Sequence, residues 1–476
     1  MPVIYYLHRG FGIFRCYRAL YAICGFVAVY FQSLVIYHLL LATGWMDPSQ
    51  ALLVAVITLI FPSFQTGNDS AIVPQYLFPV TAFYGGWWLV FLGEDFQGGT
   101  YWLIKVLSMS LIWFGFYCNA TLVLHLAMVF VWILIQWGSG QELISILKGA
   151  GVNISLPFIF WIVKEKWTPR HGIYKNYNRV KFDSFHYAVA FYTMIQNGFC
   201  APIQESWIWV RRSGLVLFVI AGLGIWGLTR PFGVCDWEQE NSLLQIAVSL
   251  FLWMAGAFAY IAVGKSFARK GIFTRNAILF SLPIALLLTA VMKSIVTLDP
   301  SLQGLVECLV GMGIGSWIFY GVILGLEWEG QTAIYEGILL RLRQKGNYEE
   351  VSIWGVIDQL DLDLPTPERA SMVWSYLFER AWNNRKAFAI YGEDLRTNPK
   401  KSEQISECIE DTTLGYDFQE VNTNGRQGTI RICRGKYFQI EGWWRNPAMI
   451  GLLYLKCRFI QKKGKQDFLS SLIIIK

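Results

Sequence analysis

Long apolar stretches follow one another through most of the chain, from Leu20 to Leu326. A helix that crosses the hydrocarbon core of a bilayer needs about 20 mostly apolar residues, because each residue adds about 1.5 Å of rise. The segments that approach this requirement are 20–43, 51–64, 76–93, 101–117, 120–137, 143–163, 213–229, 243–264, 277–297 and 304–326. The sequence therefore predicts a polytopic α-helical membrane protein with about ten transmembrane helices.

Two of these segments are weaker than the rest. Segment 51–64 is short and contains Pro62, and segment 143–163 contains Lys148, Asn153 and Pro157. Both are also compatible with re-entrant or interfacial segments, which would leave eight crossing helices.

The basic residues predict which loops stay in the cytoplasm. Lys and Arg are disfavoured on the translocated side of a membrane. With the N-terminus inside, the inner segments hold fifteen basic residues, and the outer loops hold only Lys148 and Arg230. We therefore expect a bacterial inner membrane protein whose N-terminus and C-terminus are both cytoplasmic.

The balance of apolar and charged residues changes after Leu326. Only 15% of the chain is charged, whereas soluble domains carry about 25%, and the deficit lies before this point. The predicted division is an interfacial N-terminal segment 1–19, a transmembrane bundle 20–163, a basic cytoplasmic loop 164–212, a second bundle 213–326 and a cytoplasmic domain 327–476. Within the loop, residues 182–210 mix aromatic and charged residues, as do residues 1–19. Such segments suit helices in the headgroup plane, with packing on the tail domain as the alternative.

The predicted cytoplasmic domain has mixed α+β character. Thr366 and Pro367 are typical of a helix start, and Asn446-Pro447 opens a last helix. Between them, residues 416–442 alternate like strands around a hairpin turn at Asn424-Gly425.

Charge is unevenly distributed within this domain. Residues 349–420 carry a net charge of −8, whereas residues 426–465 carry +9. The two halves could neutralise one another on folding. Alternatively, the basic segment could contact anionic lipid headgroups. Nucleic acid is disfavoured as a partner, because the whole tail is nearly neutral and lacks a clear platform for stacking bases.

Ionisable residues inside the apolar segments are candidates for function, since they are costly there. His38 and Lys105 lie near predicted outer ends, where they can reach the interface. Lys293 and Glu307 lie at similar depth in one predicted hairpin, so an ion pair is expected, with a transport or proton role as the alternative. His125 lies deeper, and we expect a neutral, hydrogen-bonded ring rather than a proton relay. The candidate intramembrane polar residues are thus His125, Lys293 and Glu307.

Several glycines are predicted to pack helices closely together. Gly222 begins a segment that matches the dinucleotide fingerprint by letters, but it lies inside an apolar span rather than after a strand. The last span adds small-xxx-small pairs. The candidate helix-packing residues are Gly222, Gly311, Gly315, Gly321 and Gly325, within this chain or against a neighbour.

The motifs of common enzymes are missing from the sequence. It has no H-E-x-x-H, no G-x-S-x-G and no metal-spaced His/Cys set, so we name no catalytic, cofactor or metal residue. The first hypothesis is a non-enzymatic scaffold or conduit subunit of a larger membrane assembly, such as a secretion or transfer machine, whose tail docks protein partners. The alternatives are a small-solute transporter or channel and a membrane-bound, lipid-dependent transferase.

Overall fold

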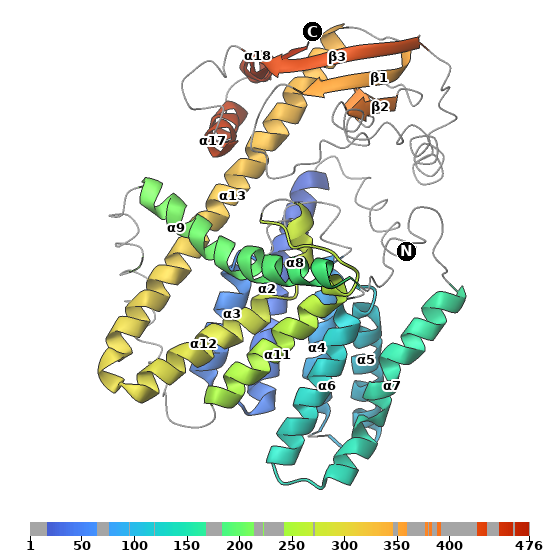
Figure 1. The fold of residues 1–476 in the computed structure, drawn as a ribbon, viewed down its shortest axis with the longest axis vertical. Helices are drawn as coiled ribbons and strands as arrows, with labels where there is room; N and C mark the ends of the chain where they lie inside the picture. The colour runs from blue at the N-terminus through green and yellow to red at the C-terminus, as the bar shows by residue number, and fades with distance from the viewer. Residues whose placement is uncertain are drawn as a thin grey trace. The chain divides into compact units, whose positions relative to one another are not determined.

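The fold is that of a computed structural model of the whole chain (Figure 1). The residues that the structure describes are 17–63, 76–94, 96–118, 120–167, 183–213, 222, 242–269, 272–345, 351–358, 377–378, 380–382, 388–391, 426–435, 447–459 and 462–475. The chain divides into two compact units. We call Met1–Arg170 with Asn178–Gly321 the membrane unit and His171–Tyr177 with Val322–Lys476 the tail unit. The two predicted bundles thus fall in one unit up to Gly321, close to the end of the last apolar run, whereas residues 171–177 of the loop between them are grouped with the tail unit.

The first helices of the membrane unit coincide with the predicted apolar segments. They are α2 (Tyr17–Thr43), α3 (Pro48–Ile60), α4 (Phe78–Gly93), α5 (Gly98–Gly115), α6 (Thr121–Gly138) and α7 (Leu143–Trp167). Asp47 caps α3, because its carboxylate accepts hydrogen bonds from the backbone of Ser49 at 2.8 Å and of Gln50 at 3.0 Å. Segment 143–163 forms one continuous helix, α7, although Pro157 lies inside it.

Six of the described helical stretches are long and apolar enough to cross a membrane. They are Ile23–Thr43, Thr121–Gly138, Leu143–Trp167, Ser242–Ile261, Ser281–Leu298 and Pro300–Lys345. Helix α3 has 13 residues, which cover only about 20 Å of a core about 30 Å thick. Apart from Ser213 and Gly222, the predicted span 213–229 lies outside the described residues. The chain is a multi-pass helical membrane protein, and the number of about ten spans stays a prediction.

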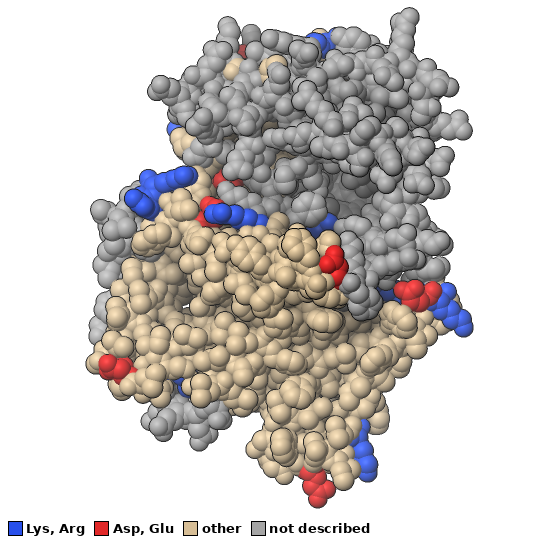
Figure 2. All heavy atoms as spheres, viewed as in Figure 1, with Lys and Arg blue, Asp and Glu red and all other residues tan. Residues whose placement is uncertain are grey.

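The surface of the membrane unit is apolar where lipid would surround it. Figure 2 shows a broad uncharged area, with Lys, Arg, Asp and Glu gathered at its margins. Large apolar side chains are exposed along α5 and α7, including Trp102, Leu103, Ile144 and Trp161. Such exposure is unfavourable in water and favourable in hydrocarbon, as expected of spanning helices.

Residues 184–213 form a helical segment that crosses the neighbouring helices of the membrane unit (Figure 1). It consists of α8 (Ser184–Ile195), the π-helical turn η3 (Gln196–Cys200) and α9 (Ala201–Ser213). Phe185, Tyr192 and Trp207 are exposed on it, at 73%, 64% and 52%. The segment thus combines a packed side with exposed aromatic residues, as expected of a helix in the headgroup plane.

The π-helical turn η3 is where this segment packs most closely on the membrane unit. Gly198 lies so near the ring of Phe280 that an added Cβ would come within 2.6 Å of it. Beside it, the Asn197 side-chain amide donates to the backbone oxygen of Phe267 at 2.7 Å, and the Phe267 N–H donates to the Thr193 hydroxyl at 3.1 Å. These contacts hold the segment on the loop that follows α11.

The second half of the membrane unit continues through α11 (Ser242–Ile261), the 3₁₀ turn η5 (Ile272–Ala277), α12 (Ser281–Leu298), the 3₁₀ turn η6 (Pro300–Leu302) and the start of α13 (Gln303–Lys345). Aromatic rings connect this half with the first. Phe61 contacts Phe199 and Trp317, with ring centroids 6.5 and 5.1 Å apart, and Trp253 contacts Phe199 and Phe280 at 5.8 and 6.1 Å. Stacked, edge-on and tilted ring pairs of this kind favour a densely packed interior.

The tail unit contains the end of α13, a sheet and two further helices. The four described strands are β1 (Val351–Asp358), β2 (Phe388–Tyr391), β3 (Arg426–Arg434) and β4 (Ile473–Ile475), in the order β2-β1-β3-β4. Strand β1 pairs in parallel with β2 and β3, whereas β4 runs antiparallel to β3. The helices are α17 (Pro447–Arg458) and α18 (Lys462–Leu472).

Some predictions for the tail can be compared directly with these elements. Helix α17 begins at Pro447, as predicted, but it is not the last helix, because α18 follows it. Strand β3 begins directly after the predicted Asn424-Gly425 turn. The turn itself and the residues after Gly435 that were expected to form strand lie outside the described residues, as does most of the helix expected from Pro367. Of that helix, 377–378 and 380–382 are described and helical.

Candidate functional site

His125 lies completely buried in α6, among aromatic rings. Its ring centroid is 5.2 Å from those of Trp87 and Phe116 and 6.2 Å from that of Phe83. Its Nε2 lies 2.8 Å from the backbone oxygen of Asn153 in α7, and its Nδ1 has no hydrogen-bond partner among the described residues. A neutral ring protonated on Nε2 fits this geometry, since that nitrogen must donate to the carbonyl.

The Asn153 carbonyl is free to accept this hydrogen bond because Pro157 lies four residues after it on α7. In a regular helix the N–H of residue 157 would donate to the oxygen of residue 153, but proline has no N–H. A free carbonyl inside a membrane must find another donor, and neighbouring helices commonly provide one. His125 fills this role, so it compensates for a proline in the adjacent helix.

A cleft of about 130 Å³ opens beside Asn153, between α4, α5, α6 and α7. Its lining is mixed, with apolar residues and a small number of polar groups. The polar lining residues are Glu94, Tyr101, Lys105, Ser108, Trp132 and Asn153. A concave site with a few convergent polar groups is the usual setting for binding a small molecule, so this is the candidate site.

Glu94, just after α4, is the best-anchored group of the cleft. Its two carboxylate oxygens accept hydrogen bonds from Trp132 Nε1 and Gln136 Nε2 of α6, each at 2.7 Å. Trp132 and Gln136 are four residues apart, so they lie on one face of α6. Charge-assisted hydrogen bonds from two directions fix the position of this carboxylate.

Lys105 contributes the positive charge of the cleft. Its Nζ donates to the hydroxyl of Tyr101 at 3.0 Å and lies 5.1 and 5.4 Å from the ring centroids of Tyr101 and Trp102. The aromatic faces stabilise the ammonium group through cation–π contact. A cleft with one fixed carboxylate and one ammonium group is chemically suited to a small polar or zwitterionic molecule.

The close packing of α4 on α5 helps to position the residues around the cleft. A Cβ added at Gly86 would lie 2.6 Å from the Ile112 side chain, and one added at Gly115 would lie 2.7 Å from Phe83. Only glycine permits these distances. This pair of glycines, which was not predicted from the sequence, allows the two helices to approach closely.

The predicted ion pair between Lys293 and Glu307 is wrong. No ion pair joins them; Glu307 instead accepts a hydrogen bond from Gln303 Nε2 at 3.1 Å, while Lys293 is 6% exposed in α12. The physical reason is that α12 and α13 diverge from the turn between them (Figure 1). Similar distance from a turn brings two residues together only when the helices run side by side. Neither residue lines the cleft.

The candidate packing glycines have different surroundings. A Cβ at Gly222 would lie 2.9 Å from the side chain of Met312 in α13, so close packing occurs there. Gly311 and Gly315 are buried in α13. Gly321 and Gly325 have open space where a side chain would lie. For these two, contact with a neighbouring protein stays a prediction.

Loop residues near the α8–α9 segment carry further charge. Arg269 pairs with Glu205 of α9, with Nη2 and Oε1 2.6 Å apart. Burial and the nearby Arg275 lower the pKa of Lys265 to about 8. At the start of α8, a hydrogen bond from His186 and one from the Phe185 N–H lower the pKa of the Asp183 carboxyl.

Comparison with known proteins adds no assignment. Within the described part of the chain, no three His, Cys, Asp or Glu side chains are grouped as a metal site would require. No protein-family model, no curated protein and no solved structure matches the chain. Its function has to be inferred from its own geometry.

Proposed function

We propose that this multi-pass protein is a non-enzymatic scaffold or conduit subunit of a larger assembly in a bacterial inner membrane, with its tail presented to cytoplasmic partners. The observation that carries the proposal is α13, a single helix of 43 residues. Its first part is apolar and belongs to the membrane unit, and its last part is a central element of the tail unit. One continuous helix thus connects a membrane-spanning segment directly to a domain that can dock partners.

Within the tail unit, several elements attach to α13. Trp382 Nε1 donates to the backbone oxygen of Leu342 at 3.1 Å, and Arg341 Nε donates to that of Ser470 in α18 at 2.7 Å. The Tyr454 hydroxyl of α17 donates to the carboxylate of Glu336 at 3.1 Å. A domain mounted in this way on a membrane helix is suited to recruiting partners, which supports a scaffold role.

The packing of the membrane unit also favours a structural role over proton transport. His125 is already engaged in satisfying the Asn153 carbonyl, and relays normally need carboxylates near the ring. Aromatic rings fill the contacts between α3, η3, α11 and α13. These features favour a structural role for the membrane unit.

Native mass analysis after extraction in mild detergent tests the proposal. The wild-type chain should be found in a particle with other protein subunits. Gly451→Val should release those subunits, because an added Cβ at Gly451 would overlap the Leu326 backbone and displace α17. Gly304→Val is the matched control, since open space surrounds Gly304. A monomeric wild-type particle without any co-purifying protein would refute the proposal.

The cleft supports a second candidate function, a transporter or channel for a small polar solute. Its fixed Glu94 carboxylate and its Lys105 ammonium group would bind opposite charges of the solute. In proteoliposomes, Lys105→Met should then abolish solute or ion flux while the protein still inserts. Lys148→Met, on the exposed start of α7, is the control. Equal flux in all three proteins would exclude this role for the cleft.

A further inference from the structure

The sequence of α13 marks the level at which this helix leaves the membrane. From Cys308 to Leu326 it contains no charged residue, and Glu327 and Glu329 follow. These 19 uncharged residues cover about 29 Å, close to the thickness of the hydrocarbon core of about 30 Å. Leu326 and the residues directly after it therefore lie at the level of the lipid headgroups.

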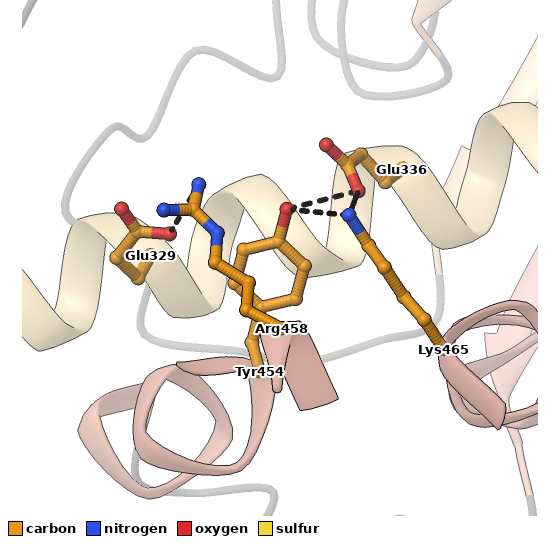
Figure 3. Close-up of polar contacts among 5 residues, drawn as sticks. All are labelled: Glu329, Glu336, Tyr454, Arg458 and Lys465. Carbon is orange, nitrogen blue, oxygen red and sulfur yellow. Dashed lines mark hydrogen bonds and ion pairs between the residues drawn. The ribbon is translucent and has the colours of Figure 1, made fainter. Parts of the chain in front are cut away.

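Helix α17 packs against α13 at this level. Gly451 of α17 lies against the backbone of Leu326 and Gly330, with no room for a side chain. Figure 3 shows that Tyr454 and Arg458 of α17 both extend toward α13 and meet two different acids on it. Arg458 Nη2 lies 3.7 Å from Glu329, and the Tyr454 hydroxyl donates to Glu336 at 3.1 Å.

Lys465 of α18 completes this contact. Its Nζ donates to the Tyr454 hydroxyl at 3.2 Å and lies 3.4 Å from the Glu336 carboxylate (Figure 3). Burial opposes its protonation, but the bond to Tyr454 and the charge of Glu336 outweigh this effect and raise the pKa of Lys465. Arg458 and Lys465 are thus neutralised by Glu329 and Glu336 of α13, and these contacts hold α17 in place.

Another face of α17 has no such partner among the residues that the structure describes. Leu452 and Lys456 lie four residues apart on α17, and Phe459 follows three residues later in the turn that ends the helix, so the three lie on one side. All three are exposed, Phe459 at 92%, and Lys456 makes no ion pair with a described residue. Apolar side chains beside a basic one are typical of a surface that contacts the interface of a membrane.

We propose that α17 is a lipid-binding helix, which rests on the anionic headgroups of the membrane that α13 crosses and contacts them through Leu452, Lys456 and Phe459. The sequence that contains α17 fits this partner in charge, because residues 426–465 carry a net charge of +9. Anionic lipid is also the material present at the level where α13 holds this helix. Lipid contact would fix the tail unit at a second point besides α13.

Photo-crosslinking of the full-length protein tests this proposal. Phe459→p-benzoylphenylalanine places a reactive group at an exposed position, so it leaves the packing of the tail unchanged. The protein is placed in nanodiscs of phosphatidylcholine alone or mixed equally with phosphatidylglycerol, each with a clickable phospholipid. The control is Lys345→p-benzoylphenylalanine, exposed at the end of α13, about 28 Å further along the helix than Leu326.

We expect position 459 to cross-link to lipid and position 345 not to do so. The yield at 459 should be higher in the anionic discs, and Lys456→Gln should lower it there by about fivefold, the change expected from one basic residue near an anionic surface. Lys345→Gln should not change it. Equal lipid labelling at 459 and 345, a yield independent of lipid charge, or cross-linking of 459 to protein instead of lipid would each overturn the proposal.

Discussion

Replacing His125 by phenylalanine separates its hydrogen bond from its ring contacts. Phenylalanine keeps an aromatic ring among Phe83, Trp87 and Phe116 but cannot donate to the Asn153 oxygen, which lies 2.8 Å from Nε2. Hydrogen bonds between membrane helices contribute about 0.6 kcal/mol on average and up to about 1.7. A buried polar group left without any partner costs about 1–3 kcal/mol. We expect His125→Phe to lower the free energy of unfolding by about 2 kcal/mol, because Pro157 has no N–H that could donate to the Asn153 oxygen instead.

Pro157→Ala provides the decisive background for this measurement. Alanine restores an N–H that can donate to the Asn153 oxygen within α7. In that background, His125→Phe should cost less than about 1 kcal/mol, since the carbonyl keeps a donor. The two substitutions should therefore be non-additive by about 1 kcal/mol or more.

Equilibrium unfolding in mixed micelles, with increasing SDS fraction, measures all four proteins of this cycle. Tryptophan fluorescence and circular dichroism should report the same transitions if unfolding is two-state. Equal costs of His125→Phe with and without Pro157 would refute the assigned role of this histidine. So would an unchanged stability of the single variant.

Three further predictions follow from packing and charge. Gly115→Val should lower the free energy of unfolding by about 1–3 kcal/mol, because a Cβ there would lie 2.7 Å from Phe83. Gly99→Val is the control and should have little effect, since open space surrounds Gly99. The same SDS titration compares the two variants. Tyr454→Phe should cost about 1 kcal/mol through loss of the bond to Glu336, measured by hydrogen exchange of α17, and unchanged exchange would contradict it. The pKa of Lys265 is lowered from 10.5 to about 8, so between these pH values the unfolded protein binds more protons than the folded one, and the free energy of unfolding should rise with pH. Thermal unfolding at pH 7.5 and 9.5 measures this rise. The unfolding temperature should rise less for Lys265→Met than for the wild type.

Long apolar runs predicted the helices of the membrane unit well. Segment 20–43 corresponds to α2 and segment 120–137 to α6, with ends shifted by a few residues. Their length is set by the thickness of the bilayer, which is a local requirement that any sequence must meet. Residues 182–210 were also expected to be helical, and α8, η3 and α9 lie there, whereas their location in the headgroup plane stays a prediction.

The candidate site depends on contacts between residues far apart in the chain, and a single sequence does not specify them. Glu94 meets Trp132 and Gln136 only because α4 and α6 pack together. One signal was nevertheless readable: Pro157 implies that the carbonyl four residues earlier lacks its helical donor. It indicates that a donor is needed, but not that His125 supplies it.

The error for Lys293 and Glu307 has the same origin. Their positions along α12 and α13 were estimated correctly, but the angle between the two helices was not available from sequence. The turn around Pro300 lets the helices diverge, and Glu307 bonds to Gln303 on its own helix. Depth in a membrane is a one-dimensional property, whereas an ion pair requires all three dimensions.

Epitope tags in the α6–α7 turn and at the C-terminus test most directly whether the tail lies in the cytoplasm. A short epitope inserted after Ser139, in the exposed turn between α6 and α7, should react with an impermeant antibody in spheroplasts, in which the outer face of the inner membrane is accessible. The same epitope after Lys476 should react only after the inner membrane is permeabilised. If the tag after Lys476 reacts in intact spheroplasts, the tail is outside and the proposed scaffold role is contradicted.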